Sequence, residues 1–391
     1  MILPRLLQVA RRMLKKERVQ ASLMRKPADK IPVFMSATPQ FLQAALGLGK
    51  HKPTTKDAWR YCVKLDLDVV QVGHPSFYPV RVLDFQMGEK YVDAFHRTHV
   101  ITGYYDEFCA PFPLRQNPKG LDLHEIRRRW DDYTFPDPEA HEFVGGIETV
   151  VAENENLNDP LHVWGVINGP FEPAWQLISD AWTDFFILAR RDRDLAKDII
   201  ERVTDYCIAA GAALIERGAN AVRIGDDYGL NEGLMCAPKT WRDLIFPSHV
   251  RLVKGLKKAG GQDMPVIFHS DGNIMAIIDW LAEGGIDALN PIQPDALDFG
   301  TVVEKVGNHL SMAGAFDLRY FLAPCTEQNR NAMERETRRL FTIIDTFNNP
   351  SIRTGFCIGP THQVQPASYP STFEAWIKMV HAINQTRAGK V

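Results

Sequence analysis

Residues 264–290, MPVIFHSDGNIMAIIDWLAEGGIDALN, contain the unit that decides the fold. Two short and largely apolar runs, Met264–His269 and Ile286–Asn290, are separated by a segment of helix length. Neither run alternates apolar with polar residues, which is typical of strands that are buried on both faces of a parallel sheet. The stretch therefore predicts a strand–helix–strand unit with parallel strands.

The same kind of run recurs along the rest of the chain. The further runs are Ile31–Ser36, Leu67–Gly73, Leu161–Asn168, Asn220–Gly225, Leu310–Ala315 and Arg353–Ile358. Most are separated by amphipathic segments, of which the clearest are Asp192–Gly218, Pro238–Gly260, Glu327–Phe347 and Ser371–Thr386. Eight strands, each followed by a helix, predict an α/β protein with a (β/α)8 TIM barrel. A doubly wound sheet is the alternative, although Gly47-Leu48-Gly49 lacks the third glycine of a dinucleotide-binding loop.

One long segment, residues 84–159, departs from this regular pattern after the second strand. It is rich in Tyr, Phe, Pro and charged residues, and Lys90–Tyr105 alternates like a β-hairpin. We interpret it as an insertion on the catalytic face that acts as a lid or a partner surface. Aromatic residues in and near it are candidates for a wall around an aromatic substrate: Phe77, Tyr78, Phe85, Tyr104, Tyr105, Phe108 and Phe112. Without repeats or linkers, residues 1–391 are expected to form a single domain.

Composition excludes several classes of protein. The 391 residues carry 45 Lys+Arg against 48 Asp+Glu, so no basic surface for nucleic acid is expected. No apolar run approaches the roughly 20 residues needed to span a bilayer. The start of the chain is interpreted as an amphipathic helix with solvated basic residues (Arg11, Arg12, Lys15, Lys16) and no signal peptide. Six cysteines without C-x-x-C spacing suggest reduced thiols in a cytoplasmic protein. A homodimer remains open.

In such a barrel the catalytic residues follow the carboxyl ends of the strands. The polar residues at these positions form a ring: Ser36, His74, Asn168, Asp226, Asp227, His269, Asp271, Asn290, Asp317, Cys357 and His362. The expected substrate-binding residues are His74, Asn168, Asp226 and Asn290. Because adjacent carboxylates cannot both point inward, one of the Asp226–Asp227 pair is expected to face the substrate and the other to cap a turn.

The most informative piece is the segment around His269-Ser270-Asp271 at the end of the predicted fifth strand. A His-x-Asp pair can present an imidazole and a carboxylate to one centre, and Cys357 could add a thiolate from the eighth strand. Such a set is typical of a catalytic zinc site with one open position. The alternative is a hydrogen-bonded histidine at the barrel mouth and a buried, apolar Cys357.

Several segments resemble the uroporphyrinogen decarboxylase superfamily and, within it, its corrinoid-dependent methyltransferase branch. The resemblance extends over about residues 18–385. The segments are Arg18–Val33, Gly225–Pro238 with Phe246-Pro247, His269–Asn273 with Gly285–Gln293, and Gly314–Asp317. The His-x-Asp-Gly-Asn block is the most distinctive of them. The fold of the superfamily is a (β/α)8 barrel, in agreement with the strand count.

The resemblance also indicates which activities to expect. The decarboxylases carry an arginine after their first Pro-Val that grips the substrate propionates, whereas Phe34–Pro39 contains none. The thiol-methylating relatives bind zinc through His-x-Cys and a later cysteine, and the matching positions here are His269, Asp271 and Cys357. A carboxylate in place of a thiolate should leave the ion a stronger Lewis acid toward oxygen. Asp271 could instead be a general acid without a metal.

The resemblance therefore implies methyl transfer from an O-methyl donor, expected to be a methoxylated aromatic, to the Co(I) corrinoid of a partner protein. Asp227, His269 and Asp271 are the expected catalytic residues, and Zn²⁺ is the expected ion. Corrinoid-binding domains of these systems show D-x-H-x-x-G, but Asp122–Arg127 lacks the glycine. The corrinoid is therefore expected in trans, on a separate protein.

Three alternatives remain open. The first is a methylcobamide:thiol methyltransferase. The second is a decarboxylase or lyase that acts on a smaller acid, with Arg81, Arg223 and Arg319 as candidates to bind its carboxylate. The third, a non-catalytic binding protein, is disfavoured because the polar ring is so complete.

Overall fold

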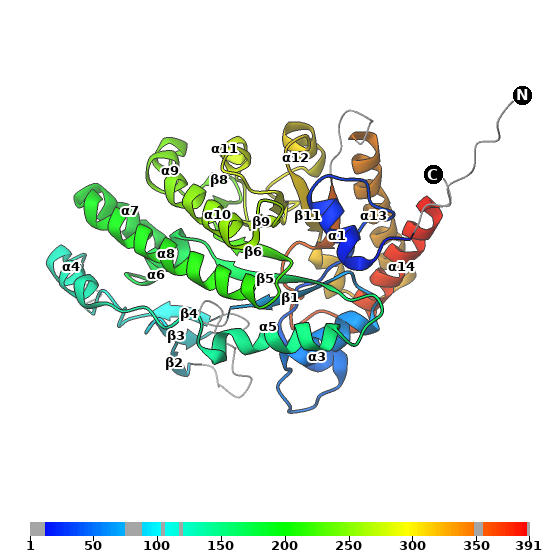
Figure 1. The fold of residues 1–391 in the computed structure, drawn as a ribbon, viewed down its shortest axis with the longest axis horizontal. Helices are drawn as coiled ribbons and strands as arrows, with labels where there is room; N and C mark the ends of the chain where they lie inside the picture. The colour runs from blue at the N-terminus through cyan, green and yellow to red at the C-terminus, as the bar shows by residue number, and fades with distance from the viewer. Residues whose placement is uncertain (1–11, 75–87, 103–105, 117–119, 348–354, 389–391) are drawn as a thin grey trace, which may run out of the picture.

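The computed structural model describes residues 12–74, 88–102, 106–116, 120–347 and 355–388. Its central sheet has seven parallel strands whose order in space is their order along the chain (Figure 1). The strands are β1 (Val69–Gly73), β5 (His162–Asn168), β6 (Ala221–Gly225), β9 (Val266–His269), β10 (Ala288–Asn290), β11 (Ser311–Phe316) and β12 (Phe356–Pro360). A doubly wound sheet would reverse its order at a switch point, so the barrel prediction is confirmed.

The predicted first strand, Ile31–Ser36, lies between the two ends of this sheet. Single bridges join Val33 to Ile358 and Ala37 to Val364 on the β12 side. On the β1 side the Asp68 N–H donates to the Val33 carbonyl, 2.9 Å away. The segment makes too few regular pairs to form a strand, but it occupies the eighth position of the barrel.

Helices surround the strands (Figure 1). Their bounds are α1 Lys15–Leu23, α2 Pro39–Leu46, α3 Thr55–Lys64, α4 Leu123–Asp132, α5 His141–Asn154, α6 Phe171–Gln176, α7 Trp182–Arg191, α8 Arg193–Glu216, α9 Pro238–Leu244, α10 Phe246–Gly260, α11 Ile278–Glu283, α12 Phe299–Val306, α13 Glu327–Phe347 and α14 Pro370–Ala388, with a 3₁₀ helix over Leu318–Leu322. The single helix predicted over 238–260 is wrong. It is two helices, because Pro247 has no N–H and cannot continue the hydrogen-bond ladder of α9.

Between β1 and β5 the chain forms a small antiparallel sheet, β2 (Lys90–Val92), β3 (Thr98–Ile101) and β4 (Asp106–Cys109). The predicted hairpin is therefore the first part of a three-stranded sheet. Arg97 joins this sheet to the barrel, because its guanidinium pairs with Asp93 at 2.6 Å and hydrogen-bonds the Gln176 side chain of α6. Of the candidate wall residues, Phe108 and Phe112 are described, and Phe77, Tyr78, Phe85, Tyr104 and Tyr105 lie outside the described residues.

The interior of the barrel is built in layers. An apolar layer plugs its amino-terminal end: Val19, Leu23, Phe34, Val69, Trp164, Ala221, Ile267, Ala288, Ala313 and Cys357. Because side chains alternate along a strand, the residues two positions further on form the next layer. This layer includes four polar side chains, Gln71, Arg223, His269 and Asn290. The change from apolar to polar marks the floor of the barrel mouth.

Two other expectations concern the ends and the surface of the molecule. The basic residues near the start are not all solvated: Arg12 is exposed, but Lys15 is buried and pairs with Asp66 at 2.7 Å. Arg11 lies outside the described residues. No helix among the described residues is both long and apolar enough to cross a membrane.

Candidate functional site

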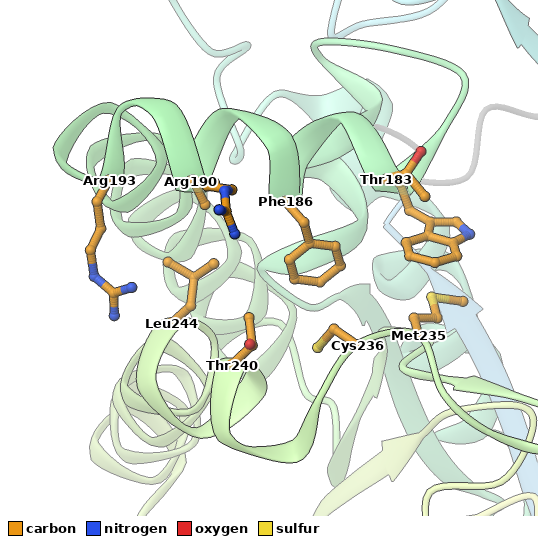
Figure 2. Close-up of a pocket in the computed structure, with 10 residues that line it drawn as sticks. Thr183, Phe186, Arg190, Arg193, Met235, Cys236, Thr240 and Leu244 are labelled. Carbon is orange, nitrogen blue, oxygen red and sulfur yellow. The ribbon is translucent and has the colours of Figure 1, made fainter.

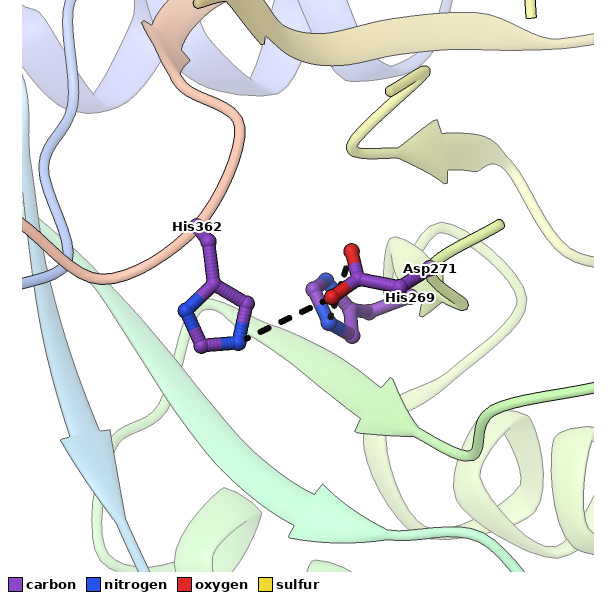
Figure 3. Close-up of side chains that lie close together, drawn as sticks. All are labelled: His269, Asp271 and His362. Atoms are coloured by element: carbon purple, nitrogen blue, oxygen red, sulfur yellow. Dashed lines mark ion pairs between the residues drawn. The ribbon is translucent and has the colours of Figure 1, made fainter. Parts of the chain in front are cut away.

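Three side chains meet at the carboxyl end of the barrel (Figure 3). His269 ends β9, Asp271 follows two residues later, and His362 lies on the loop after β12. The Asp271 carboxylate lies between the two imidazoles, with Oδ1 3.9 Å from His269 Nε2 and Oδ2 3.8 Å from His362 Nε2. One donor atom from each of the three residues lies within 4.8 Å of the others. We call these residues the His–Asp–His cluster.

His269 is held in a defined orientation from behind. Its Nδ1 lies 2.6 Å from Asn290 Oδ1, while Asn290 donates its Nδ2–H to the Ala313 carbonyl at 2.9 Å. Since Asn290 Oδ1 can only accept, the hydrogen bond places the proton of a neutral imidazole on Nδ1. Burial, the Arg223 guanidinium and His362 all lower the His269 pKa well below its usual range. The Nε2 lone pair is therefore free of a proton and directed into the cluster.

The donor set of the cluster suits a divalent transition metal. Two imidazoles and one carboxylate are typical ligands of Zn²⁺, Fe²⁺ and related ions, and three protein ligands leave a position open. Bonds of about 2.0–2.1 Å in a tetrahedral site place ligand atoms about 3.4 Å apart. The two carboxylate–imidazole distances are 3.8–3.9 Å and no two donor atoms of the cluster are more than 4.8 Å apart, so metal binding requires the side chains to draw together by up to about 1.4 Å. The Asn290 contact also matches the usual outer partner of a metal-bound histidine. The residues therefore fit a metal.

Cys357, the third ligand expected from the sequence, is not near this cluster. It is fully buried in the apolar plug, where it is the register partner of Ala313 on β11. Burial raises the pKa of its thiol to about 12, so the side chain is a neutral, apolar group. The structure thus brings His362 to the position expected for Cys357.

The two adjacent carboxylates Asp226 and Asp227 have separate surroundings. Asp226 is fully buried and accepts hydrogen bonds from the N–H groups of Phe171 and Glu172 and from the Tyr228 hydroxyl, at 2.6–3.0 Å. It therefore caps the first turn of α6. Asp227 instead accepts the Asp271 N–H at 2.8 Å and lies beside the cluster. One of the pair caps a turn and the other lies at the site, but the substrate-binding assignment of Asp226 is wrong: both its oxygens accept hydrogen bonds from the chain, so Asp226 is the cap and Asp227 is the group at the site.

Carboxyl groups at the site are electrostatically strained. Burial and the neighbouring Asp271 carboxylate raise the pKa of Asp227 to about 6, and burial raises that of Asp271 to about 6. Burial, Asp227 and Asp226 also raise the pKa of Glu172, on α6, well above its usual range. Without a cation, like charges so close together favour retained protons. A bound cation would favour the ionised Asp271 instead.

The remaining expected residues are divided between the mouth and the helical shell. Asn168 ends β5 and is 4% exposed, with its Oδ1 unpartnered in the described structure. His74 is completely buried, donates its Nε2–H to the Pro138 carbonyl at 2.8 Å and packs on Phe143. Burial lowers the His74 pKa to about 4. Its surroundings are those of a packed, neutral histidine and not of the barrel mouth.

A close backbone contact fixes the loop that carries Asp271. The hairpin β7 (Gly229–Leu230) and β8 (Gly233–Leu234) follows Asp227, and Gly229 passes directly against Gly272. A Cβ atom on Gly272 would lie 2.5 Å from the Gly229 carbonyl, and Gly272 has a φ of +76°. The Gly272 N–H also donates to Gln293 Oε1 at 2.9 Å. Glycine at position 272 is thus required by the packing of this loop.

Sequence reasoning missed Glu172 and did not place His362 among the ligands. Glu172 lies four residues after Asn168, the last residue of the predicted strand Leu161–Asn168. A carboxylate so soon after a strand end is a usable signal. His362 was among the strand-end residues, but no sequence spacing indicates that the loop after β12 turns back toward β9.

Comparisons with known proteins agree with this architecture. The sequence profile of the uroporphyrinogen decarboxylase (URO-D) family matches residues 122–383. A uroporphyrinogen decarboxylase from Psychromonas ingrahamii is 22% identical over 381 residues, which cover 95% of this chain and 98% of that protein. Another, from Hydrogenovibrio crunogenus, is 27% identical over 187 residues, covering 46% and 47%.

Solved structures show the same fold at low sequence identity. A methyltransferase from Methanosarcina mazei superimposes with a TM-score of 0.66 at 16% identity, covering 95% of this chain and 99% of that one. A B12-independent methionine synthase from Shewanella gives a TM-score of 0.52 at 12% identity, with 92% and 98% covered. The profile match, which spans more than half of the sequence, shows that this chain belongs to the uroporphyrinogen decarboxylase family.

Proposed function

We propose that this protein transfers a methyl group from an O-methyl donor, with methoxylated aromatics as the donor class, to the Co(I) corrinoid of a separate protein. The observation that carries the proposal is the His–Asp–His cluster beside the Asp227 carboxyl at the barrel mouth. Removal of a methyl group from an ether leaves negative charge on oxygen. The site offers two means of stabilising that charge, a cation and a protonated carboxyl group.

The nature of the ligands favours an oxygen donor over a thiol. Imidazole and carboxylate are harder ligands than thiolate. Among the described residues, no cysteine lies in the cluster of possible metal ligands. A metal held by His269, Asp271 and His362 would supply Lewis acidity toward the donor oxygen. Asn290 orients His269, and the Asp271 N–H orients Asp227. Methylation of a coenzyme thiol is therefore the less favoured alternative.

Asp227 is the proposed proton donor. Its pKa of about 6 leaves a larger protonated fraction near neutrality than an ordinary aspartate has, and a carboxyl group whose pKa lies near the operating pH is an effective general acid. The proton would pass from the Asp227 carboxyl to the alkoxide or phenolate oxygen as the methyl–oxygen bond breaks. Glu172, whose pKa is also raised, would be able to return a proton to this site.

The corrinoid partner is inferred from the missing D-x-H-x-x-G motif and the absence of a second α/β unit in the described chain. The cobalt would have to approach the open end of the barrel, since the apolar plug closes the other end. The sheet β2–β4, in the described part of the segment 84–159, is proposed to bound this approach as a lid or docking surface.

The first experiment combines the purified protein with chemically reduced cob(I)alamin and a panel of methoxylated aromatics, without oxygen. Appearance of the methylcobalamin spectrum with a particular donor is expected. The variants Asp227→Asn and His362→Ala should each lower the rate by about 100-fold or more, whereas Cys357→Ser should keep it. Loss of activity in Cys357→Ser at an unchanged melting temperature would overturn this assignment.

A decarboxylase acting on a smaller acid is the second candidate, and Arg223 favours it. Its guanidinium lies inside the barrel, 3.2 Å from both His269 Nδ1 and Asn290 Oδ1. Arg319 is instead occupied by Asp317 and Asp295, and Arg81 lies outside the described residues. Release of CO₂ from small carboxylic acids, with no methyl transfer from aromatic, amine, thiol or methanol donors even with the cognate corrinoid protein, would favour this function.

A further inference from the structure

A pocket of about 470 Å³ lies outside the barrel wall (Figure 2). On one side it is lined by Trp182 and Phe186 of α7, and on the other by Met235 and Cys236, which precede α9. The volume falls within the usual range of about 300–1,000 Å³ for small-molecule sites. None of its lining residues belongs to the His–Asp–His cluster, so the pocket is distinct from the candidate active site.

Two guanidinium groups, those of Arg190 and Arg193, lie at one end of the pocket, and Met235 lies toward the other (Figure 2). In the described part of the chain, neither guanidinium has a carboxylate within ion-pair distance. Arg193 makes only a 3.3 Å hydrogen bond to the main-chain carbonyl of Asp243. No lining residue is acidic. The pocket therefore combines apolar side chains, among them Trp182, Phe186 and Met235, with a positively charged end.

Neighbouring arginines on the same face behave differently. Arg127 pairs with Asp192 at 2.6 Å, and Arg251 pairs with Asp205 at 2.7 Å. Lack of a carboxylate partner is not confined to the pocket, since Arg191 lies beside it and donates to the Leu121 carbonyl at 3.3 Å. What distinguishes Arg190 and Arg193 is that both line one hollow beside apolar side chains, which is the charge arrangement expected at a site for an anion with a nonpolar body.

We propose that this pocket binds a small aromatic anion, with its ring between Phe186 and Met235 and its carboxylate or phosphate at Arg190 and Arg193. Aromatic and thioether side chains provide favourable contacts for a planar ring. Guanidinium groups match the planar, two-oxygen edge of a carboxylate and the oxygens of a phosphate. The site is separate from the proposed methyl transfer and does not depend on it.

The pocket is also connected to the active-site loop through the hairpin β7–β8. The Met235 N–H donates to the Tyr228 carbonyl at 2.9 Å, and the Asn273 N–H donates to the Leu230 carbonyl at 2.7 Å. A ligand in contact with Met235 therefore touches the end of the hairpin that packs against the Asp271–Gly272 loop. This places the anion site one hairpin away from the His–Asp–His cluster.

The first test uses the unmodified protein and its own cysteines. Cys236 lines the pocket, whereas the equally half-buried Cys325 does not. Alkylation by iodoacetamide, followed by mass spectrometry of the two peptides, should be slowed at Cys236 by saturating 2-naphthoate and unchanged at Cys325. The neutral 2-naphthamide should give no such protection. Equal protection of both cysteines, or protection by the amide, would overturn the proposal.

The second test measures affinity by calorimetry with 2-naphthoate and 2-naphthyl phosphate, which separates the two possible anionic groups. The double variant Arg190→Gln/Arg193→Gln should weaken the preferred anion by about tenfold or more. Arg191→Gln is the matched control, since Arg191 is adjacent but does not line the pocket. Unchanged affinity in the double variant, or equal weakening in the control, would show that the arginines do not form the site.

Discussion

At the scale of single residues, the geometry of the cluster depends on a residue outside it, Asn290. Asn290 fixes the proton of His269 on Nδ1 and thereby exposes Nε2. Loss of such an outer partner typically weakens metal binding 10- to 100-fold. We therefore expect Asn290→Ala to weaken Zn²⁺ or Co²⁺ affinity to that extent, measured by competition with a chelating dye.

Asn168→Ala is the control for this change, because Asn168 also ends a barrel strand, but its Oδ1 has no hydrogen-bond partner among the described residues. Its metal affinity should match that of the unmodified protein. Equal losses in both variants would mean that general disturbance of the barrel mouth, and not the orientation of His269, controls binding.

Asp226 provides a pH test of the cap. Burial is the main cause that raises its pKa from 3.8 to about 7, so between these values the folded chain holds a proton that the unfolded chain releases. The free energy of unfolding therefore falls as pH rises through this window, by at most about 1.4 kcal/mol per pH unit from this group. Below pH 3.8 both states are protonated and the contribution is constant.

Asp226→Asn removes that titration while keeping an oxygen to accept from the α6 amides. Urea unfolding at several pH values should show the variant gaining stability relative to the unmodified protein as pH rises from about 5 to 7. Taking the difference between the two proteins removes the shared titration of Asp227 and Asp271. Parallel pH curves would contradict the assignment of a raised pKa to Asp226.

How far sequence predicts a site residue depends on where it lies. His269, Asp271 and Asp227 are predictable because His269 ends a strand and the two aspartates follow strands within two residues, and strand ends share one face of a barrel. Cys357 is inside its strand, so alternation places it one layer lower, in the apolar plug. His362 is on a loop, and the path of a loop is set by tertiary contacts that no periodicity records.

At the scale of elements, the buried strands were predictable because both of their faces are covered, which requires apolar residues at successive positions. Ile31–Ser36 has the same character, but it makes only isolated bridges to β12. The break between α9 and α10 was readable from Pro247. The hairpin β7–β8 was not predicted. Its strands are only two residues long, and its role depends on the contact between Gly229 and Gly272, which lie far apart in the sequence.

That contact gives a prediction for the loop of Asp271. Gly272→Ala would place a Cβ atom 2.5 Å from the Gly229 backbone at a φ of +76°, so we expect a loss of at least about 2 kcal/mol and weaker metal binding. Gly261→Ala is the matched control, because Gly261 has a φ of +87° but nothing within 4 Å. It should lose only about 1 kcal/mol, the strain of the left-handed backbone.

Thermal unfolding and chelator competition measure the two effects together. Similar losses of stability in both glycine variants would show that the cost of Gly272→Ala comes from the positive φ, and not from a clash with the Gly229 backbone. Normal metal affinity in Gly272→Ala would show that the contact between Gly272 and the hairpin does not determine the position of Asp271.

At the scale of the whole molecule, buried ion pairs as well as apolar packing hold the amino-terminal end of the barrel together. Arg18 of α1 is 1% exposed and pairs with Asp29 at 2.6 Å and Asp68 at 2.5 Å. Asp68 in turn accepts the Val33 N–H at 2.9 Å. These contacts join α1, the segment in the eighth position and the start of β1, where the sheet has few backbone pairs.

Removal of this arginine should therefore cost more than a surface ion pair. Arg18→Met keeps much of the apolar length but leaves the buried Asp68 carboxylate without its cation, which typically costs about 3–5 kcal/mol. Arg12→Gln removes an exposed arginine at 3.8 Å from Asp159, a change expected to cost less than about 1 kcal/mol. The Arg18 network lies at the amino-terminal end of the barrel and the His–Asp–His cluster at the carboxyl end. Chemical unfolding should therefore show a lower free energy of unfolding for Arg18→Met than for Arg12→Gln, while the metal affinity of the folded molecules stays equal. Comparable stability of the two variants would mean that packing of Val19 and Leu23 alone closes the amino-terminal end of the barrel.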